Sequence, residues 1–113
     1  MSDNGTTQAP ARYLVGAREA VDMMRDMAFT TAKEALCPPG TPDGHIRVVA
    51  DKLFAHACDT HALKYAVRGG RKGDPEGDIE KMAWWRAMAE HARTGSPDPR
   101  SRRADYKPYV YPD

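Results

Sequence analysis

Four positively charged side chains lie within nine residues near the middle of the chain, interleaved with three glycines. The cations are Lys64, Arg68, Arg71 and Lys72, and the glycines are Gly69, Gly70 and Gly73. Arginine can bind two phosphate oxygens at once, lysine adds a point charge, and glycine lets the backbone approach a ligand closely. The pattern predicts a site for the phosphate groups of a small anionic ligand. It fits equally well a solvated helix end whose cations pair with the acids that follow.

Aromatic and acidic neighbours extend this candidate site. Tyr65 lies between the cations, and Lys81 and Trp84 follow on the next helical segment. Trp84 and Trp85 cannot face the same way on a helix, so one could stack on a base while the other packs in the core or at an interface. Asp78 is the candidate magnesium ligand, because this ion takes one or two carboxylates together with phosphate. The alternative is that Asp78 is only a favourable charge at a helix start.

The elements that must position these residues are helices. Hydrophobic spacing predicts them over residues 11–36, 45–68 and 75–94, and no strands are expected. Prolines and a glycine at 38–40 end the first helix, and Gly69 is placed to cap the second. Asp74 and Pro75 begin the third as its N-cap and first residue, and Gly95 ends it. The positions expected on the buried side of the third helix are Ile79, Met82, Trp85 and Ala89.

The predicted fold is therefore all-α, with three helices, the last two forming an antiparallel hairpin joined by the basic glycine-rich loop. Residues 1–10 are expected to be a disordered lead and residues 11–95 the helical domain. Residues 96–113, rich in proline and tyrosine, are expected to be an extended arm or a disordered tail. Three helices with this much tryptophan and methionine do not cover themselves, so a homo-oligomer is expected.

Composition narrows the function classes. The 113 residues carry a net charge of +1, which argues against binding to nucleic acid or membrane through bulk electrostatics. No apolar run approaches the roughly 20 residues that span a bilayer, and the polar start of the chain is unlike a signal peptide. The two cysteines, Cys37 and Cys58, form no disulfide framework and suit a reducing cytoplasm.

Other chemistry-bearing groups are weaker candidates. The chain has no Walker A motif for phosphate binding. Cys58 and His61 could share a helix face as zinc ligands, but a structural site needs four ligands and no second pair has the spacing. Glu19 and Asp22 supply only half of the paired acids of a helical nucleotide pyrophosphatase. The arginines and tyrosines of the tail could contact nucleic acid.

The stretch from His61 to about Glu90 resembles a tailed-phage family catalogued as domain of unknown function 3310, also called SaV-like. Trp85 stands where the family usually has tyrosine, and Met82 where it prefers alanine. The positions that match the family pattern are Ala62, Lys64, Tyr65, Arg68, Gly70, Arg71, Lys72, Asp78, Ile79, Lys81 and Trp84.

The resemblance implies phage origin, action in the cytoplasm of an infected bacterial host, and nucleotide chemistry. The family includes a phage nucleotide kinase that lacks a P-loop, so the leading hypothesis is nucleotide-phosphate binding with activity like that of a nucleoside monophosphate kinase. The main alternative is a binding module without turnover that sequesters a nucleotide second messenger and so blunts host defence. A third is a structural or DNA-associated phage protein.

Overall fold

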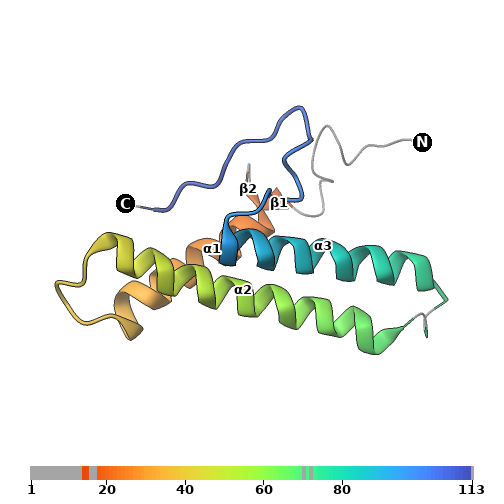
Figure 1. The fold of residues 1–113 in the computed structure, drawn as a ribbon, viewed down its shortest axis with the longest axis horizontal. Coiled ribbons are helices and arrows are strands. Elements are labelled where there is room, and N and C mark those ends of the chain that lie inside the picture. Colours follow the sequence, from red (N-terminus) through yellow and green to blue (C-terminus); the bar gives the residue numbers. More distant parts are fainter. Residues whose placement is uncertain (1–13, 16–17, 70, 72, 113) are drawn as a thin grey trace. The chain divides into compact units, whose positions relative to one another are not determined.

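The computed structural model describes residues 14–15, 18–69, 71 and 73–112, with side chains from residue 18 onward. The lead expected at residues 1–10 lies outside the described residues. The described part is mainly helical, which confirms the predicted helical class (Figure 1). Helix α1 spans Ala20–Thr31, α2 spans Asp43–Arg68 and α3 spans Pro75–Thr94. None of the described helices is long and apolar enough to cross a bilayer.

The first helix begins later than its hydrophobic spacing predicts. Two short strands, β1 (Leu14–Val15) and β2 (Arg18–Glu19), pair antiparallel, with Leu14 opposite Glu19 and Val15 opposite Arg18. The prediction of helix over these positions, and of a chain without strands, is therefore wrong. Glu19 has extended backbone angles, and its side chain makes no capping hydrogen bond. The helix therefore begins at Ala20 and does not include the residues before it.

One wide helical turn, η3, continues α1 over Ala32–Leu36. The N–H of Cys37 donates to the carbonyl oxygen of Ala32, five residues earlier, at 2.9 Å. This spacing is that of a π-helix, which holds one more residue per hydrogen-bonded turn than an α-helix does. The prolines that follow end the helix as predicted, because Pro38 and Pro39 cannot continue it.

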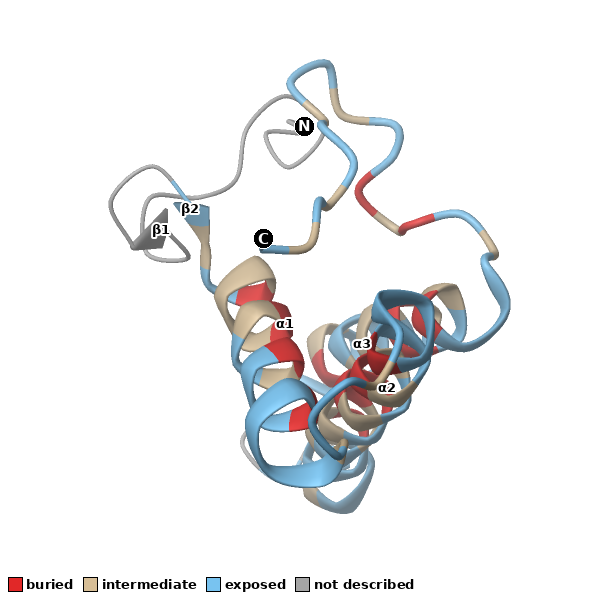
Figure 2. Ribbon diagram, turned by 90° about the vertical axis from the view of Figure 1, so that its left-hand side faces the viewer, coloured by how far each residue is buried: buried red, intermediate tan, exposed pale blue. Residues whose placement is uncertain are grey.

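The chain divides into two compact units, which are described separately. The first comprises the described residues up to Asp51 together with those from Arg100 onward, and the second comprises Lys52–Pro99. The boundary falls within α2. In the first unit, part of α1 is buried (Figure 2). Its buried residues are Val21, Arg25 and Phe29, and Arg25 forms a 3.1 Å ion pair with Asp51.

Residues 100–112 have no regular secondary structure and follow one side of α1. Arg100 and Arg103 contact residues at or just before the start of α1, and two tyrosines contact residues further along the helix. Arg100 pairs with Glu19 and Asp22, Tyr109 donates to Asp26 at 2.7 Å, and the Tyr111 ring lies 5.4 Å from the Phe29 ring. These partners are three or four residues apart, so they lie on a single stripe of the helix.

In the second unit the core comes from the facing sides of α2 and α3. The buried apolar residues are Phe54, Ala55, Cys58 and Ala62 from α2, and Met88, Ala89 and Ala92 from α3. Ile79, which was expected to be buried, is 60% exposed, whereas its neighbour Asp78 is 2% exposed. The prediction for Ile79 is wrong because Asp78 takes the inward position, where it binds Arg68.

Both ends of α3 agree with the sequence prediction. The Asp74 side chain accepts a hydrogen bond from the N–H of Gly77 at 3.0 Å, and Pro75 is the first helical residue. A Cβ at position 77 would collide with the Asp74 carboxylate, so glycine there gives the cap its room. At the other end, Gly95 has a φ of 78°, and its N–H donates to the carbonyl oxygen of His91.

Candidate functional site

Within the second unit, the end of α2 meets the start of α3 through a series of side-chain contacts. Each step of three or four residues back along α2 is matched by an equal step forward along α3. The helices therefore run in opposite directions here, and the predicted site residues of one face those of the other. The contacts join Arg68 to Asp78, Tyr65 to Lys81, and His61 to Trp85.

Three cations from the two helices lie around the ring of Tyr65. Lys64 Nζ lies 4.8 Å from the ring centroid, Arg68 Cζ 5.0 Å and Lys81 Nζ 5.5 Å. These distances are within the range over which an aromatic ring attracts a cation. We call Lys64, Arg68 and Lys81 the cation cluster. The sequence pattern placed its members near one another, and the structure brings them together around one ring.

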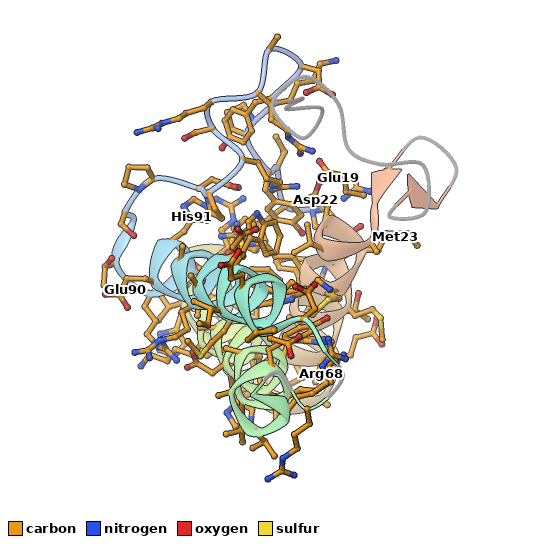
Figure 3. All side chains as sticks on the ribbon, turned by 90° about the vertical axis from the view of Figure 1, so that its right-hand side faces the viewer. Glu19, Asp22, Met23, Arg68, Glu90 and His91 are labelled. Carbon is orange, nitrogen blue, oxygen red and sulfur yellow. The ribbon has the colours of Figure 1, made fainter. Side chains whose placement is uncertain are left out.

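Arg68, which is labelled in Figure 3, lies at the end of α2. The buried carboxylate of Asp78 on α3 holds its guanidinium in place. Arg68 Nη2 donates to Asp78 Oδ1 at 2.6 Å, and Arg68 Nε lies 3.1 and 3.2 Å from the two carboxylate oxygens. This hydrogen bonding is the main reason that the pKa of Arg68 is raised above its ordinary value. The pair links the two helices and gives the buried carboxylate of Asp78 a charged partner.

Lys64 and Lys81 differ from Arg68 because both are exposed and neither forms an ion pair with any acid that the structure describes. Asp78 is the acid that forms an ion pair with the cluster among the described residues, and Asp74 acts on Arg68 through its charge. The cluster therefore carries an excess of positive charge on its solvent side. An anionic group could be attracted there without displacing an existing partner of either lysine.

The glycine-rich loop contributes less to the cluster than the sequence suggests. Arg71 is exposed, and its backbone N–H donates to the carbonyl oxygen of Arg68 at 2.8 Å. No contact joins its side chain to the described residues of the cluster. Gly69 caps α2 as predicted, with a φ of 50° and an N–H that donates to the Tyr65 carbonyl oxygen. Gly70 and Lys72 lie outside the described residues.

Half-buried aromatic rings lie further along the helices from the cation cluster. His61 stacks on Trp85 with the ring centroids 4.4 Å apart, and Trp84 meets Trp85 edge to face at 5.0 Å. Burial, and then the charge of Lys64, lower the pKa of His61 and so favour the neutral ring. Trp84 is half-buried against Trp85, and the stacking of a base on it stays a prediction.

The residues around Cys58 have structural partners. Cys58 is fully buried, and Asp59 binds Arg93 on α3. Among the residues that the structure describes, no group of three or more histidine, cysteine, aspartate or glutamate side chains could hold a metal ion. Both carboxylate oxygens of Asp78 already accept hydrogen bonds from Arg68, so a magnesium ion would have to share this carboxylate with the guanidinium. Magnesium binding there stays a prediction.

Sequence reasoning missed one set of acid–arginine pairs and left another open. Glu19 and Asp22, which are labelled in Figure 3, were considered as half of the acid set of a nucleotide pyrophosphatase, and both bind Arg100 from the tail. Asp78 was considered as a magnesium ligand, a helix-start charge or one of the acids that pair with the loop cations, and it is the buried partner of Arg68. This choice could have been made by aligning the two helices in opposite directions, because the Arg68–Tyr65–His61 steps match those from Asp78.

Comparisons with family models, curated proteins and solved structures give no match. The resemblance to the phage family therefore depends on the residues between 61 and 90 alone.

Proposed function

We propose that the cation cluster binds the phosphate groups of a nucleotide. The observation that carries this proposal is the placement of Lys64, Arg68 and Lys81 around Tyr65, within 5.5 Å of its ring centroid. Like charges at this separation repel one another, and a bound phosphate would relieve that repulsion. Each hydrogen bond to a charged group contributes about 1.5–3 kcal/mol, which is enough to give measurable affinity from a few such contacts.

The surroundings of the cluster suit a nucleotide better than a free phosphate ion. The stacked rings of His61 and Trp85 lie four residues along each helix from Tyr65 and Lys81, which corresponds to about 6 Å. A nucleotide places an aromatic base within a few ångströms of its phosphates, and aromatic side chains can stack on such a base. Trp84 contacts this ring pair at its edge and is the candidate for that stacking.

The proposed biological setting is phage nucleotide metabolism, which the family resemblance supports. In phosphoryl transfer the protein mainly positions reactants and stabilises charge, and a cluster of cations can supply the second of these. The proposed activity is accordingly a nucleotide kinase reaction without a P-loop. A non-catalytic form of the same protein would use the same cations to sequester a nucleotide, and only turnover separates the two.

Isothermal calorimetry with a panel of nucleotides tests the proposal. Lys64→Ala and Lys81→Ala are each expected to weaken binding about tenfold, because each removes a charge-assisted contact. Arg86→Ala is the matched control, since Arg86 is an exposed cation on α3 outside the cluster. Chromatography of the incubated nucleotides shows whether they are turned over. If both lysine variants bind like the wild-type protein, the cluster is not the binding site.

The formation of a homo-oligomer also stays a prediction. It is argued here from two exposed apolar residues of α2 instead of from the tryptophans and methionines. Leu63 and Val67 are each 60% exposed and lie four residues apart on α2, so they form an apolar stripe that a second copy would cover. Light scattering is expected to give a mass above 12.5 kDa. Leu63→Asp should lower that mass to the value of a single chain, whereas a wild-type protein that is monomeric at high concentration would remove the expectation.

A further inference from the structure

The guanidinium group of Arg68 has two edges that can each form a pair of hydrogen bonds, and Asp78 occupies one of them. Nε and Nη2 make up the occupied edge. The other edge consists of Nη1 and the second hydrogen of Nη2, and it makes no hydrogen bond with any residue that the structure describes. The Arg68 side chain is 30% exposed, so a ligand can reach it.

Asp78 is well suited to fix the direction of that second edge. Its side chain is 2% exposed and is held in the inner side of α3, so it has little freedom to follow a moving partner. A planar guanidinium bound through two of its nitrogens cannot rotate without breaking a hydrogen bond. The position of the carboxylate therefore determines where Nη1 points.

We propose that Asp78 is a positioning residue, which orients Arg68 so that its second edge binds two oxygens of a terminal phosphate group. The proposal rests on the proposed function, because it assigns a role within the same site. It differs from a metal-binding role for Asp78, since here the carboxylate acts on the ligand only through Arg68.

The charges of the site favour a terminal phosphate over a phosphodiester. Three cations surround Tyr65, and the described acids that act on Arg68 are Asp78 and Asp74, so positive charge remains in excess. A phosphate monoester carries about −1.5 to −2 charges at pH 7, because its second pKa is about 6. A phosphodiester carries a single negative charge and has only two unesterified oxygens for all three cations.

A double-mutant cycle tests the proposal, with AMP and cyclic AMP as probes that share a base and a single phosphorus. Affinities are measured by calorimetry for the wild-type protein, Asp78→Asn, Arg68→Ala and the double variant, at a temperature where circular dichroism shows each to be folded. The wild-type protein is expected to bind AMP several times more tightly than cyclic AMP. Asp78→Asn should weaken AMP binding about tenfold, the usual size of one charge-assisted hydrogen bond.

The decisive comparison is the effect of Asp78→Asn when Arg68 is already absent. If Asp78 acts through Arg68, the substitution has no further effect on AMP affinity in the Arg68→Ala background. If Asp78 has only a structural role, Asp78→Asn should lower the melting temperature. Its effect on AMP affinity should then not depend on Arg68, and the ratio of AMP affinity to cyclic AMP affinity should not change. Equal losses in both backgrounds would overturn the proposal, because Asp78 would then act on the ligand independently.

Arg68→Lys provides a second variant should Asp78→Asn fail to fold. Lysine keeps the positive charge beside Asp78 but cannot offer two edges, so the ratio of AMP affinity to cyclic AMP affinity should fall while the fold is kept. Unchanged discrimination in Arg68→Lys would also overturn the proposal. Failure of the wild-type protein to bind either nucleotide would instead contradict the proposed function, so the two failures are distinguishable.

Discussion

Arg100 and Asp22 are 78 residues apart in the sequence, and two terminal nitrogens of the arginine donate to the two carboxylate oxygens at 3.0 Å. Arg100 also binds Glu19 at 3.2 Å, and its side chain is 4% exposed. Arg100→Ala removes the arginine that binds both oxygens of Asp22, whereas Glu19 keeps Arg103, and the loss is expected to cost on the order of 3 kcal/mol of unfolding free energy. Thermal denaturation followed by circular dichroism measures the loss.

Arg102 is the matched control for this experiment, because it is an exposed arginine in the same segment. Arg102→Ala should leave the melting temperature almost unchanged. A similar melting temperature for both variants would show that residues 100–112 do not stabilise the first unit. Because Arg100 is buried and paired with acids, Arg100→Ala is unsuitable as a neutral control for ligand binding.

Tyr109 is expected to make the unfolding free energy sensitive to alkaline pH. Burial, and then its hydrogen bond to Asp26, raise the pKa of this phenol well above its ordinary value. Below about pH 10 the phenol is neutral in both folded and unfolded chains, so its contribution is fully present. Above that pH the unfolded chain loses the proton first, and the free energy of unfolding falls.

Tyr109→Phe removes both the hydrogen bond to Asp26 and the ionisation of the phenol, and the two effects on the unfolding free energy appear at different pH. At neutral pH it should cost about 1.5 kcal/mol, because it removes a hydrogen bond to a charged acceptor. Between pH 10 and 11 its unfolding free energy should fall less steeply than that of the wild-type protein, since phenylalanine does not ionise. Denaturant titrations at several pH values measure the unfolding free energy. If it falls with pH equally steeply in the wild-type protein and in Tyr109→Phe, the prediction is wrong.

The imidazole of His61 is expected to titrate below the ordinary histidine pKa of about 6.5. Burial against Trp85 is the larger cause and the charge of Lys64 the smaller. Because the folded state favours the neutral ring, the contribution of His61 to stability is present above pH 6.5 and is lost as pH falls through its folded pKa. Nuclear magnetic resonance of the imidazole protons measures the titration directly.

Lys64→Gln should raise the pKa of His61 part of the way back, because it removes the smaller cause and leaves the burial unchanged. His61→Gln identifies the resonance and should reduce the loss of stability in acid. An unshifted histidine resonance would mean that the His61 ring is more open to water than its stacking on Trp85 indicates.

Magnesium gives a further test of Asp78. If Asp78 only positions Arg68, AMP affinity should be the same in EDTA and in excess magnesium, because the carboxylate then contacts the guanidinium and no metal ion. Calorimetry under the two conditions decides this. If EDTA weakens AMP binding in the wild-type protein and not in Asp78→Asn, the carboxylate binds a metal ion.

Local features of the fold could be predicted from the sequence, because their causes lie within a few residues. Asp74, Pro75 and Gly95 determine the ends of α3 through their own backbone preferences, and each is found where expected. The start of α1 could not be located in this way, since the spacing of Leu14 and Val21 fits a helix as well as it fits a strand followed by a helix. Nothing in the local pattern distinguishes the two.

The partners of charged residues were the least predictable part of the candidate site. The cations at 64, 68 and 81 were identified from their types, but the burial of Asp78 depends on which side of α3 faces α2. A rotation of one residue exchanges Asp78 with Ile79, and the apolar residue is the natural choice for the core. The pairing with Arg68 outweighs that preference, and it is visible only when both helices are placed together.

The wide turn η3 means that the first helical segment contains one residue more than an α-helix of the same reach would need. Deleting one residue between 33 and 36 would convert the bond from Cys37 to Ala32 into an ordinary α-helical one. Because each α-helical residue turns the chain by about 100°, the added residue sets the direction in which Pro38 leaves the helix. A change in chain length at this position would redirect the connection to α2 while leaving Ala20–Thr31 intact, so η3 is where evolution could alter the angle between the two helices by insertion or deletion.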